Sequence, residues 1–229
     1  MQRREAPRIP PGTAAIVLTG GGSTRMGSHK PALPVGGRPI IERVLGAVES
    51  LPTVVVGLPY AVPPGVPVVR EDPPGSGPVA GIAAGLAGLD ALVDAGSVGD
   101  LRLVAVLAGD LPFLTAAALA DLAAALEPGR DADRADAPEV SLAAGPDGAP
   151  NWLCAVWRVP ALRRRLAALG DPSGTSVRRL TSEVRTVLVA DHEGWSADVD
   201  SPEDLDAARA RARRGAGPRP RPPLSPRGG

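Results

Sequence analysis

The sequence predicts a single α/β domain with a mostly parallel central sheet that is covered by helices. Short apolar runs, typical of strands buried on both faces, alternate with stretches of helical periodicity. Such alternation favours βαβ units with right-handed crossovers. The length of 229 residues suits one domain. Because 44% of the residues are hydrophobic but only 2% are aromatic, the core is expected to consist of Ala, Val, Leu and Ile.

The first half of the chain shows this alternation most clearly. Strands are expected at about 14–18, 53–58, 66–69 and 101–107, and helices at about 40–51, 78–89 and 116–126. A short turn at 34–39 precedes the first helix, in which Ile41, Val44 and Val48 recur at helical spacing. Thr115 is expected to cap the third helix.

After residue 126 the pattern is less regular. Beyond a polar loop at 127–138, strands are expected at 140–144, 152–158 and 184–190, and helices at 161–169 and 176–180. The last helix has the clearest start, because Ser201 stands at the N-cap, Pro202 follows at the first helical position and Asp204 completes a capping-box pattern.

The domain boundaries follow from composition. Residues 1–12 are basic and contain proline, and residues 215–229 are dominated by Pro, Arg and Gly. Both segments are expected to be disordered tails around a single domain at 13–214. The C-terminal tail is locally basic, since 209–227 contains no acidic residue, and a solvated tail is favoured over a binding arm.

Charge and cysteine content limit the classes of function. Lys and Arg together number 25, as do Asp and Glu, so no global field draws the protein to nucleic acid or to an anionic membrane, and neither is expected as a partner. The single cysteine, Cys154, cannot form an internal disulfide, which fits a reducing compartment. No signal peptide or membrane span is visible, and a cytoplasmic location is expected.

A glycine-rich segment follows the first strand directly. Gly20, Gly21 and Gly22 allow backbone N–H groups to approach an anion without a Cβ in the way, and they lie at the sheet edge where open parallel sheets bind ligands. Arg25 and Lys30, the only lysine in the chain, supply the charge that a triphosphate needs. The spacing fits neither a P-loop nor a dinucleotide-binding loop. The segment indicates phosphate binding, and the alternative is a tight strand-to-helix turn.

Carboxylates mark a second position on the same edge. Asp110 follows the fourth strand, where it is expected to bind Mg²⁺, because Mg²⁺ takes one or two carboxylates together with substrate phosphates. The alternative interpretation is that Asp110 is only a loop or helix-capping residue. Asp198 and Asp200 alternate on an extended segment and would point the same way. They could complete a metal site, contact an acceptor, or form the turn before the Ser201 cap.

These motifs together resemble a known family. Residues 18–30 are similar to the L-x-G-G-x-S-x-R-M-G-x-x-K signature of the molybdenum cofactor guanylyltransferases, within the wider NTP-transferase family. Further matches follow in order: Asp72 after the third strand, Gly77–Gly81 for G-P-L-A-G, Gly109–Pro112 for a strand-terminal D-x-P, and Asp198–Leu205 for N-x-N-T-P-E-D-L. The resemblance spans about 14–212.

The resemblance implies a fold, a reaction and a set of roles. The fold would be a Rossmann-like three-layer sandwich of the nucleotide-diphospho-sugar transferase type. The enzyme would transfer GMP from GTP to the terminal phosphate of molybdopterin with Mg²⁺, releasing pyrophosphate, and molybdoenzyme-maturation proteins would be its partners. Arg25 and Lys30 would bind the phosphates and Asp110 the Mg²⁺. The nucleotide would contact Leu18, Thr19, Gly20, Gly21, Gly22, Lys30, Asp72 and Asp110.

Departures from the family pattern leave the base and the activity open. His29 stands where Asp is frequent, Gly57 where some members have Asn, and Asp198 and Asp200 replace asparagines. Aspartates of this kind occur in relatives that use CTP, whereas Thr19-Gly20-Gly21 is closer to the guanylyltransferase pattern. The alternatives are a molybdopterin cytidylyltransferase, another small-phosphate nucleotidyltransferase, and a silent paralogue that binds nucleotide or pterin.

The tryptophans are the remaining candidates. Trp152 and Trp157 are expected in the core, and Trp195, which precedes the aspartate pair, is a candidate for stacking on the pterin.

Overall fold

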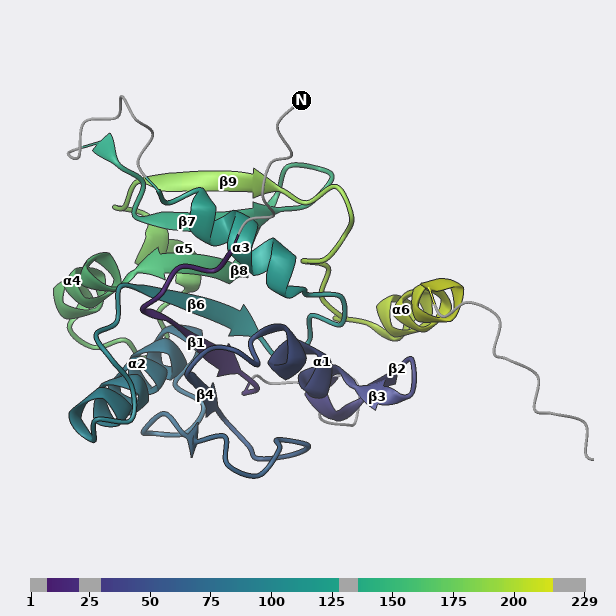
Figure 1. Ribbon diagram of the computed structural model, residues 1–229, viewed down its shortest axis with the longest axis horizontal. Helices are drawn as coiled ribbons and strands as arrows, with labels where there is room; N and C mark the ends of the chain where they lie inside the picture. Colours follow the sequence, from purple (N-terminus) through teal and green to yellow (C-terminus); the bar gives the residue numbers. More distant parts are fainter. Residues whose placement is uncertain (1–7, 21–29, 128–135, 216–229) are drawn as a thin grey trace, which may run out of the picture.

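A seven-stranded sheet forms the centre of the computed structural model, which describes residues 8–20, 30–127 and 136–215. Its strands are β1 (Thr13–Leu18), β4 (Thr53–Val56), β5 (Val68–Val69), β6 (Leu103–Ala108), β7 (Val140–Ala144), β8 (Pro150–Arg158) and β9 (Thr186–Ala190). The order across the sheet is β5-β4-β1-β6-β8-β7-β9. Within this sheet β8 alone runs antiparallel to its neighbours, which confirms the mostly parallel sheet that the sequence predicts (Figure 1).

Helices cover both faces of the sheet. They are α1 (Ile40–Ala47), α2 (Pro78–Asp94), α3 (Ala116–Ala124), α4 (Val159–Leu169), α5 (Val177–Thr181) and α6 (Pro202–Gly215), with a 3₁₀ turn η2 (Lys30–Ala32) and a small hairpin of β2 (Pro34–Val35) and β3 (Arg38–Pro39). One apolar cluster joins the sheet to α1, α3 and α6, and another joins it to α2, α4 and α5. The three-layer α/β sandwich is therefore confirmed.

Strand β1 shows how the sequence builds the two layers. Ala15 and Val17 belong to the cluster under α1 and α3, whereas Ala14, Ile16 and Leu18 belong to the cluster under α2. All of them are buried, as expected for a central strand of a parallel sheet. Each Val, Leu or Ile buried in this way contributes about 1.5–3 kcal/mol, so aliphatic side chains stabilise the fold with few aromatics.

Several element ends differ from the prediction. β4 ends at Val56 rather than 58, because Gly57 takes a φ of 127°, and α1 ends at residue 47 rather than 51. The helix α2 continues to Asp94, beyond the predicted end at 89. The stretch 34–39, predicted as a turn, is the β2–β3 hairpin.

The predicted tails are only partly covered by the structure. Within 8–12, the Gly12 carbonyl accepts the N–H groups of Arg102 at 2.7 Å and Leu103 at 3.2 Å, so this stretch lies against β6. At the other end α6 extends through Gly215. Residues 1–7 and 216–229 lie outside the described residues. In the part of the chain that the structure describes, every helix is too short or too polar to cross a membrane.

Candidate active site

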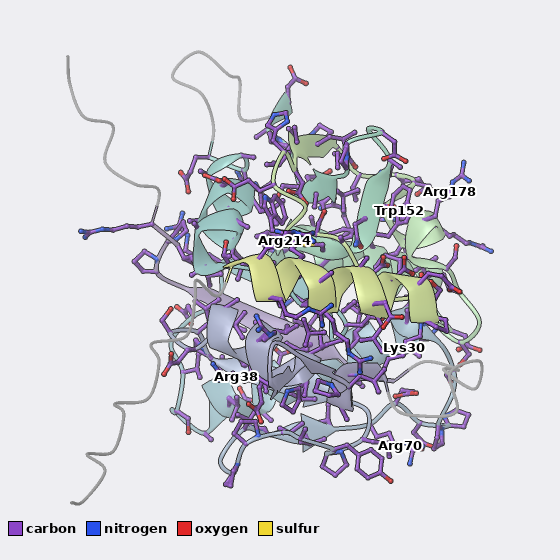
Figure 2. All side chains as sticks on the ribbon, turned by 90° about the vertical axis from the view of Figure 1, so that its right-hand side faces the viewer. Lys30, Arg38, Arg70, Trp152, Arg178 and Arg214 are labelled. Atoms are coloured by element: carbon purple, nitrogen blue, oxygen red, sulfur yellow. The ribbon has the colours of Figure 1, made fainter. Side chains whose placement is uncertain are left out.

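The loops that carry the predicted site residues meet at one edge of the sheet. Leu18, the last residue of β1, pairs with Val56 at the end of β4 and with Ala108 at the end of β6. The strands β7 and β9 end at the same edge, where β8 begins. In Figure 1 the arrowheads of β6 and β9 point towards this edge, and Figure 2 looks onto it. The edge is where open parallel sheets bind ligands.

A first cavity of about 410 Å³ opens between the ends of β1 and β4 and the start of α2. This size is within the range of small-molecule sites. Its lining includes the backbone of glycines and a few larger side chains, namely Leu18, Thr19, Gly20, Val56, Gly57, Leu58, Arg70, Glu71, Gly75, Gly77, Pro78 and Gly81. The predicted contacts Leu18, Thr19 and Gly20 therefore lie together on one wall.

Gly57 shows why the family's asparagine is absent here. A Cβ at this position would lie 2.6 Å from the Thr19 hydroxyl oxygen and 2.7 Å from the Gly20 nitrogen. The Thr19 hydroxyl is itself held close by donating a hydrogen bond to the Val56 carbonyl at 3.0 Å. With the positive φ, this close approach of two backbones requires glycine.

The structure does not place the other predicted nucleotide contacts in this cavity. Gly21, Gly22, Arg25 and His29 lie outside the described residues, so the roles assigned to them stay predictions. Asp72 is exposed and is not among the residues that line the first cavity, whereas its neighbours Arg70 and Glu71 are. The role of Asp72 at the nucleoside also stays a prediction. Neither Arg70 nor Glu71 was singled out by the sequence motifs.

A second, larger cavity of about 930 Å³ adjoins the first. Gly77 and Pro78, at the start of α2, line both. The remaining lining comes from the loops after β6, β7 and β9, from the start of β8, and from the start of α5 with the loop before it. It includes Asp110, Asn151, Trp152, Ser176, Arg178, Asp198 and Asp200. The three predicted aspartates thus share one cavity.

Lys30 lies among these aspartates. Its ammonium forms an ion pair with Asp200, with 2.7 Å between Nζ and Oδ1, and its side chain is only 11% exposed. The backbone N–H of Val199 donates to the Asp110 carbonyl at 3.2 Å, which fixes the aspartate segment to the loop after β6. In the view of Figure 2, Lys30 lies between Arg70, which lines the first cavity, and Trp152 and Arg178, which line the second.

The electrostatics of Asp110 are unusual for an aspartate. Its pKa is raised to about 6, chiefly by burial and next by the carboxylate of Asp198, while the ammonium of Lys30 partly offsets both. The pKa of Asp198 is raised as well, by burial and then by Asp200. Lys30 and Asp110 are therefore close enough to influence each other, as the sequence predicts for a shared triphosphate site.

The residues present fit a magnesium ion whose coordination shell is completed by oxygens of the substrate. The Oδ1 atom of Asp110 is buried and, among the described residues, has no hydrogen-bond partner. Such an oxygen is a suitable ligand for Mg²⁺, which needs one or two carboxylates and takes its other oxygens from phosphate and water. Elsewhere in the described ranges too, His, Cys, Asp and Glu side chains do not gather in threes at metal-binding distance.

The tryptophans differ from the prediction in part. Trp157 is fully buried in the core, as predicted, whereas Trp152 is half-buried, packs against the core from its edge and also lines the second cavity. The stacking prediction for Trp195 is wrong, because its ring is 8% exposed within the apolar cluster under α1 and α3. Asp191 accepts the N–H groups of Gly194 and Ser196, and this tight turn directs Trp195 inwards.

Comparison with known proteins identifies the family of this chain. Residues 15–187 match a family model described as the MobA-like NTP transferase domain. A probable molybdenum cofactor guanylyltransferase of Mycobacterium tuberculosis is 36% identical over 176 residues, covering 70% of this chain and 80% of the relative. The molybdenum cofactor guanylyltransferase of Rhodobacter capsulatus is 33% identical over 197 residues, covering 84% and 92%.

Solved structures agree on the fold. Molybdopterin-guanine dinucleotide biosynthesis protein A from Archaeoglobus fulgidus has a TM-score of 0.61 at 20% identity, covering 88% of this chain and 99% of that one. A nucleotidyl transferase from Methanothermobacter thermautotrophicus has a TM-score of 0.66 at 22% identity, covering 89% and 98%. At this identity the structures support the nucleotide-diphospho-sugar transferase fold, and the sequence relatives support the family. The chain belongs to the MobA-like NTP transferase family.

Proposed function

We propose that this protein transfers GMP from GTP to the terminal phosphate of molybdopterin, with or without bound molybdenum, and releases pyrophosphate. The relatives named molybdenum cofactor guanylyltransferase support this substrate pair. The observation that carries the proposal in this chain is the pair of cavities that share the start of α2 at Gly77 and Pro78. Two substrates bound there would meet beside Asp110 and Lys30.

The first cavity is the site proposed for the nucleoside of GTP. Apolar side chains and glycine backbone suit a flat base. Gly20 lies on the wall of this cavity, and in the sequence the glycine-rich segment that begins there ends at Lys30. Lys30, together with Arg25, would neutralise the phosphates. Fixed positive charge aimed at the reacting phosphate stabilises the transition state without reorganisation.

Asp110 is the proposed ligand of Mg²⁺. Its orphaned carboxylate oxygen provides the support, and Asp198 lies close enough to raise its pKa. The chemistry that Mg²⁺ supplies when bound is neutralisation of charge on the α-phosphate and on the leaving pyrophosphate. Because a carboxylate must be ionised to bind the ion, Asp110 gives up its proton on loading.

The second cavity is the site proposed for the acceptor. Trp152 offers a flat apolar face for a pterin ring, and Arg178 offers a cation for its phosphate. An oxygen of the acceptor phosphate attacks the α-phosphorus of GTP, and the bond to the β-phosphate oxygen breaks as pyrophosphate leaves. This reaction needs no protein nucleophile, because the acceptor phosphate is already anionic, but it does need in-line positioning of the two substrates.

The cellular setting follows from the same proposal. The reaction would take place in the cytoplasm, in agreement with a free and buried Cys154. The dinucleotide product would pass to proteins that mature molybdoenzymes.

Product analysis tests the proposed function. The protein is incubated with molybdopterin, Mg²⁺ and each of the four nucleoside triphosphates in turn, and the products are identified by mass spectrometry. A guanine dinucleotide with an equal amount of pyrophosphate is expected from GTP. A cytosine product in its place would establish the cytidylyltransferase alternative, and tight binding without turnover would establish the silent paralogue.

A further inference from the structure

Asp200 contacts the cation that the proposed function assigns to phosphate. Its carboxylate pairs with the ammonium of Lys30, with 2.7 Å between Oδ1 and Nζ. The guanylyltransferase pattern has asparagine at this position, so the negative charge is a departure of this chain from that pattern. We infer that Asp200 competes with nucleotide phosphate for Lys30 and thereby restricts the site to the Mg²⁺ complex of the nucleotide. The inference rests on the proposed function in one respect, that a nucleoside triphosphate binds at Lys30.

Lys30 is held where a phosphate-binding cation is needed. It begins η2, directly after the glycine-rich segment, and its side chain is largely covered. Among the described residues, Asp200 is the group that accepts a hydrogen bond from its ammonium. A phosphate that binds Lys30 therefore has to take the place of this carboxylate.

The carboxylate of Asp200 can leave Lys30 while its backbone stays in place. The side chain is 71% exposed, so solvent surrounds most of it. Its backbone N–H donates to Oδ2 of Asp204 at 3.1 Å, and the same oxygen accepts the N–H of Ser201 at 2.8 Å. The start of α6 thus anchors the main chain, and a rotation of the Asp200 side chain is enough to expose the ammonium.

The surrounding charge makes this exchange unfavourable for a nucleotide without metal. Asp110 and Asp198 lie within electrostatic reach of the same ammonium, so one cation stands among three carboxylates. A free triphosphate would have to break the Lys30–Asp200 pair and approach the other two carboxylates, and such repulsion is a source of specificity. In the Mg²⁺ complex part of the phosphate charge is already neutralised, and the carboxylates face a second cation. Lys30 is then available to phosphate.

Asparagine at position 200 would not have this effect. Its side chain has the shape of aspartate but no charge, so it can accept from Lys30 only as a neutral group, and the contact is weaker. Asp200→Asn therefore removes the competition and keeps the packing. It also restores the residue of the guanylyltransferase pattern.

Equilibrium binding of GTP to the full chain, without acceptor, tests the inference. Affinity is measured at about pH 8, where all three carboxylates are ionised, in excess EDTA and again with Mg²⁺. Ionic strength is held constant, because salt screens such charges. In EDTA, Asp200→Asn is expected to bind GTP about 5-fold or more tightly than the unaltered protein, as the release of a partly exposed charge pair allows. With Mg²⁺ the variant should gain nothing, so its preference for the Mg²⁺ complex falls by at least the same factor.

Two controls separate this competition from other effects. Asp206→Asn removes the same charge from an exposed site on α6 and should leave both affinities unchanged. Guanosine carries no phosphate, so Asp200→Asn should not change its affinity. Both variants should unfold at the temperature of the unaltered protein, because both side chains are exposed.

An unchanged affinity for GTP in EDTA would overturn the inference, and a simultaneous loss of affinity with Mg²⁺ would identify Asp200 as a metal ligand alone. An equal gain in Asp206→Asn, or an equal gain with and without Mg²⁺, would overturn it too. Tighter metal-free binding by Asp200→Asn, with no dinucleotide formed by the unaltered protein, would refute the proposed function alone. Dinucleotide formation without that gain would refute the role of Asp200 alone.

Discussion

At the scale of single residues, the proposed catalysis depends on two largely covered side chains of opposite charge, Lys30 and Asp110. Lys30 is the one lysine that the sequence retains, and its side chain is only 11% exposed. Asp110 sits within its electrostatic influence at the end of β6. In the proposed roles, a point cation and a carboxylate that would bind Mg²⁺ have different tasks, so neither could replace the other.

Removing either charge should slow the reaction without unfolding the protein. Lys30→Ala and Asp110→Ala are each expected to lose roughly 10²-fold or more in turnover, as loss of one preorganised charge does in other enzymes. Initial rates of pyrophosphate release with GTP and molybdopterin measure this. Asp206→Asn, an exposed change on α6, is the control and should keep the normal rate. Near-normal turnover in both alanine variants, with the fold intact, would contradict the assignment.

The raised pKa of Asp110 predicts a pH-dependent stability. The ordinary pKa is 3.8 and the folded value is about 6, so between these values the folded protein binds more protons than the unfolded chain. Stability therefore falls as the pH rises through this window and stays lower above it. Asp110→Asn does not titrate, so without Mg²⁺ and nucleotide its melting temperature should exceed that of the unaltered protein at pH 7 to 8.

The difference between the two proteins should shrink as the pH falls through 6 and on towards 3, because below its ordinary pKa of 3.8 Asp110 is mostly protonated in both states. Melting curves at intervals across this range measure it. A difference that is constant with pH, or that grows towards pH 4, would show that burial does not raise the pKa of this carboxyl.

The sequence predicted some site residues and missed others for identifiable reasons. Leu18, Thr19 and Asp110 were found because each follows directly on an apolar strand. Glu71 and Asp72 are adjacent carboxylates in a loop, and no periodicity indicates which of them lines the cavity. Trp152 begins a strand, where sequence alone cannot separate a core residue from one at the cavity mouth.

At the scale of elements, α2 positions both cavities through its close packing on the sheet. A Cβ on Gly85 would lie 2.5 Å from Cγ2 of Ile16 on β1 and 3.0 Å from Cγ2 of Val56 on β4. The helix therefore approaches the sheet more closely than a side chain at this point would allow. Its N-terminus at Gly77 and Pro78 is fixed where the two cavities meet.

Gly85→Ala should destabilise the protein even though alanine favours a helix. The intrinsic gain is about 1 kcal/mol, whereas overpacking a filled core costs about 1–3 kcal/mol. Gly46→Ala on α1 is the matched control, because a Cβ there meets no atom within 4 Å, and it should stabilise. Urea unfolding of both variants gives the comparison. A stabilised Gly85→Ala variant would show that α2 is not held this tightly.

The elements themselves were largely predictable, and their ends were not. Every strand of the sheet was expected from an apolar run. The signal is clearest for β1 and β6, because strands buried on both faces are continuously apolar. The end of β4 was missed because Leu58 is as apolar as a strand residue, and only the φ of Gly57 ends the strand. The extension of α2 over residues 90–94 was missed as well; the helix ends shortly before Gly96, which has a φ of 67°.

At the scale of the whole molecule, one sheet edge collects the chemistry. Every strand but β8 runs in the same direction in the described sheet, so their following loops lie side by side. The antiparallel insertion of β8 between β6 and β7 brings Asn151 and Trp152 to this edge as well. A strand's apolar pattern does not reveal its partners, and this part of the topology was therefore not predictable.

The distribution of charge also makes sense only in the folded molecule. The chain carries equal numbers of acidic and basic residues, yet Asp110, Asp198 and Asp200 are gathered around Lys30 in one place. This local excess of carboxylate beside the ammonium of Lys30 fits the proposal that a divalent ion binds there together with substrate phosphates.

The most direct test of the account is a crystal structure with Mg²⁺ and a GTP analogue whose α–β bridging oxygen is replaced by a methylene group. The base is expected in the first cavity, and the α-phosphate between Lys30 and Asp110, facing the second cavity. A nucleotide bound elsewhere, or an α-phosphate turned away from both residues, would contradict the central claim that the two cavities serve one transfer reaction.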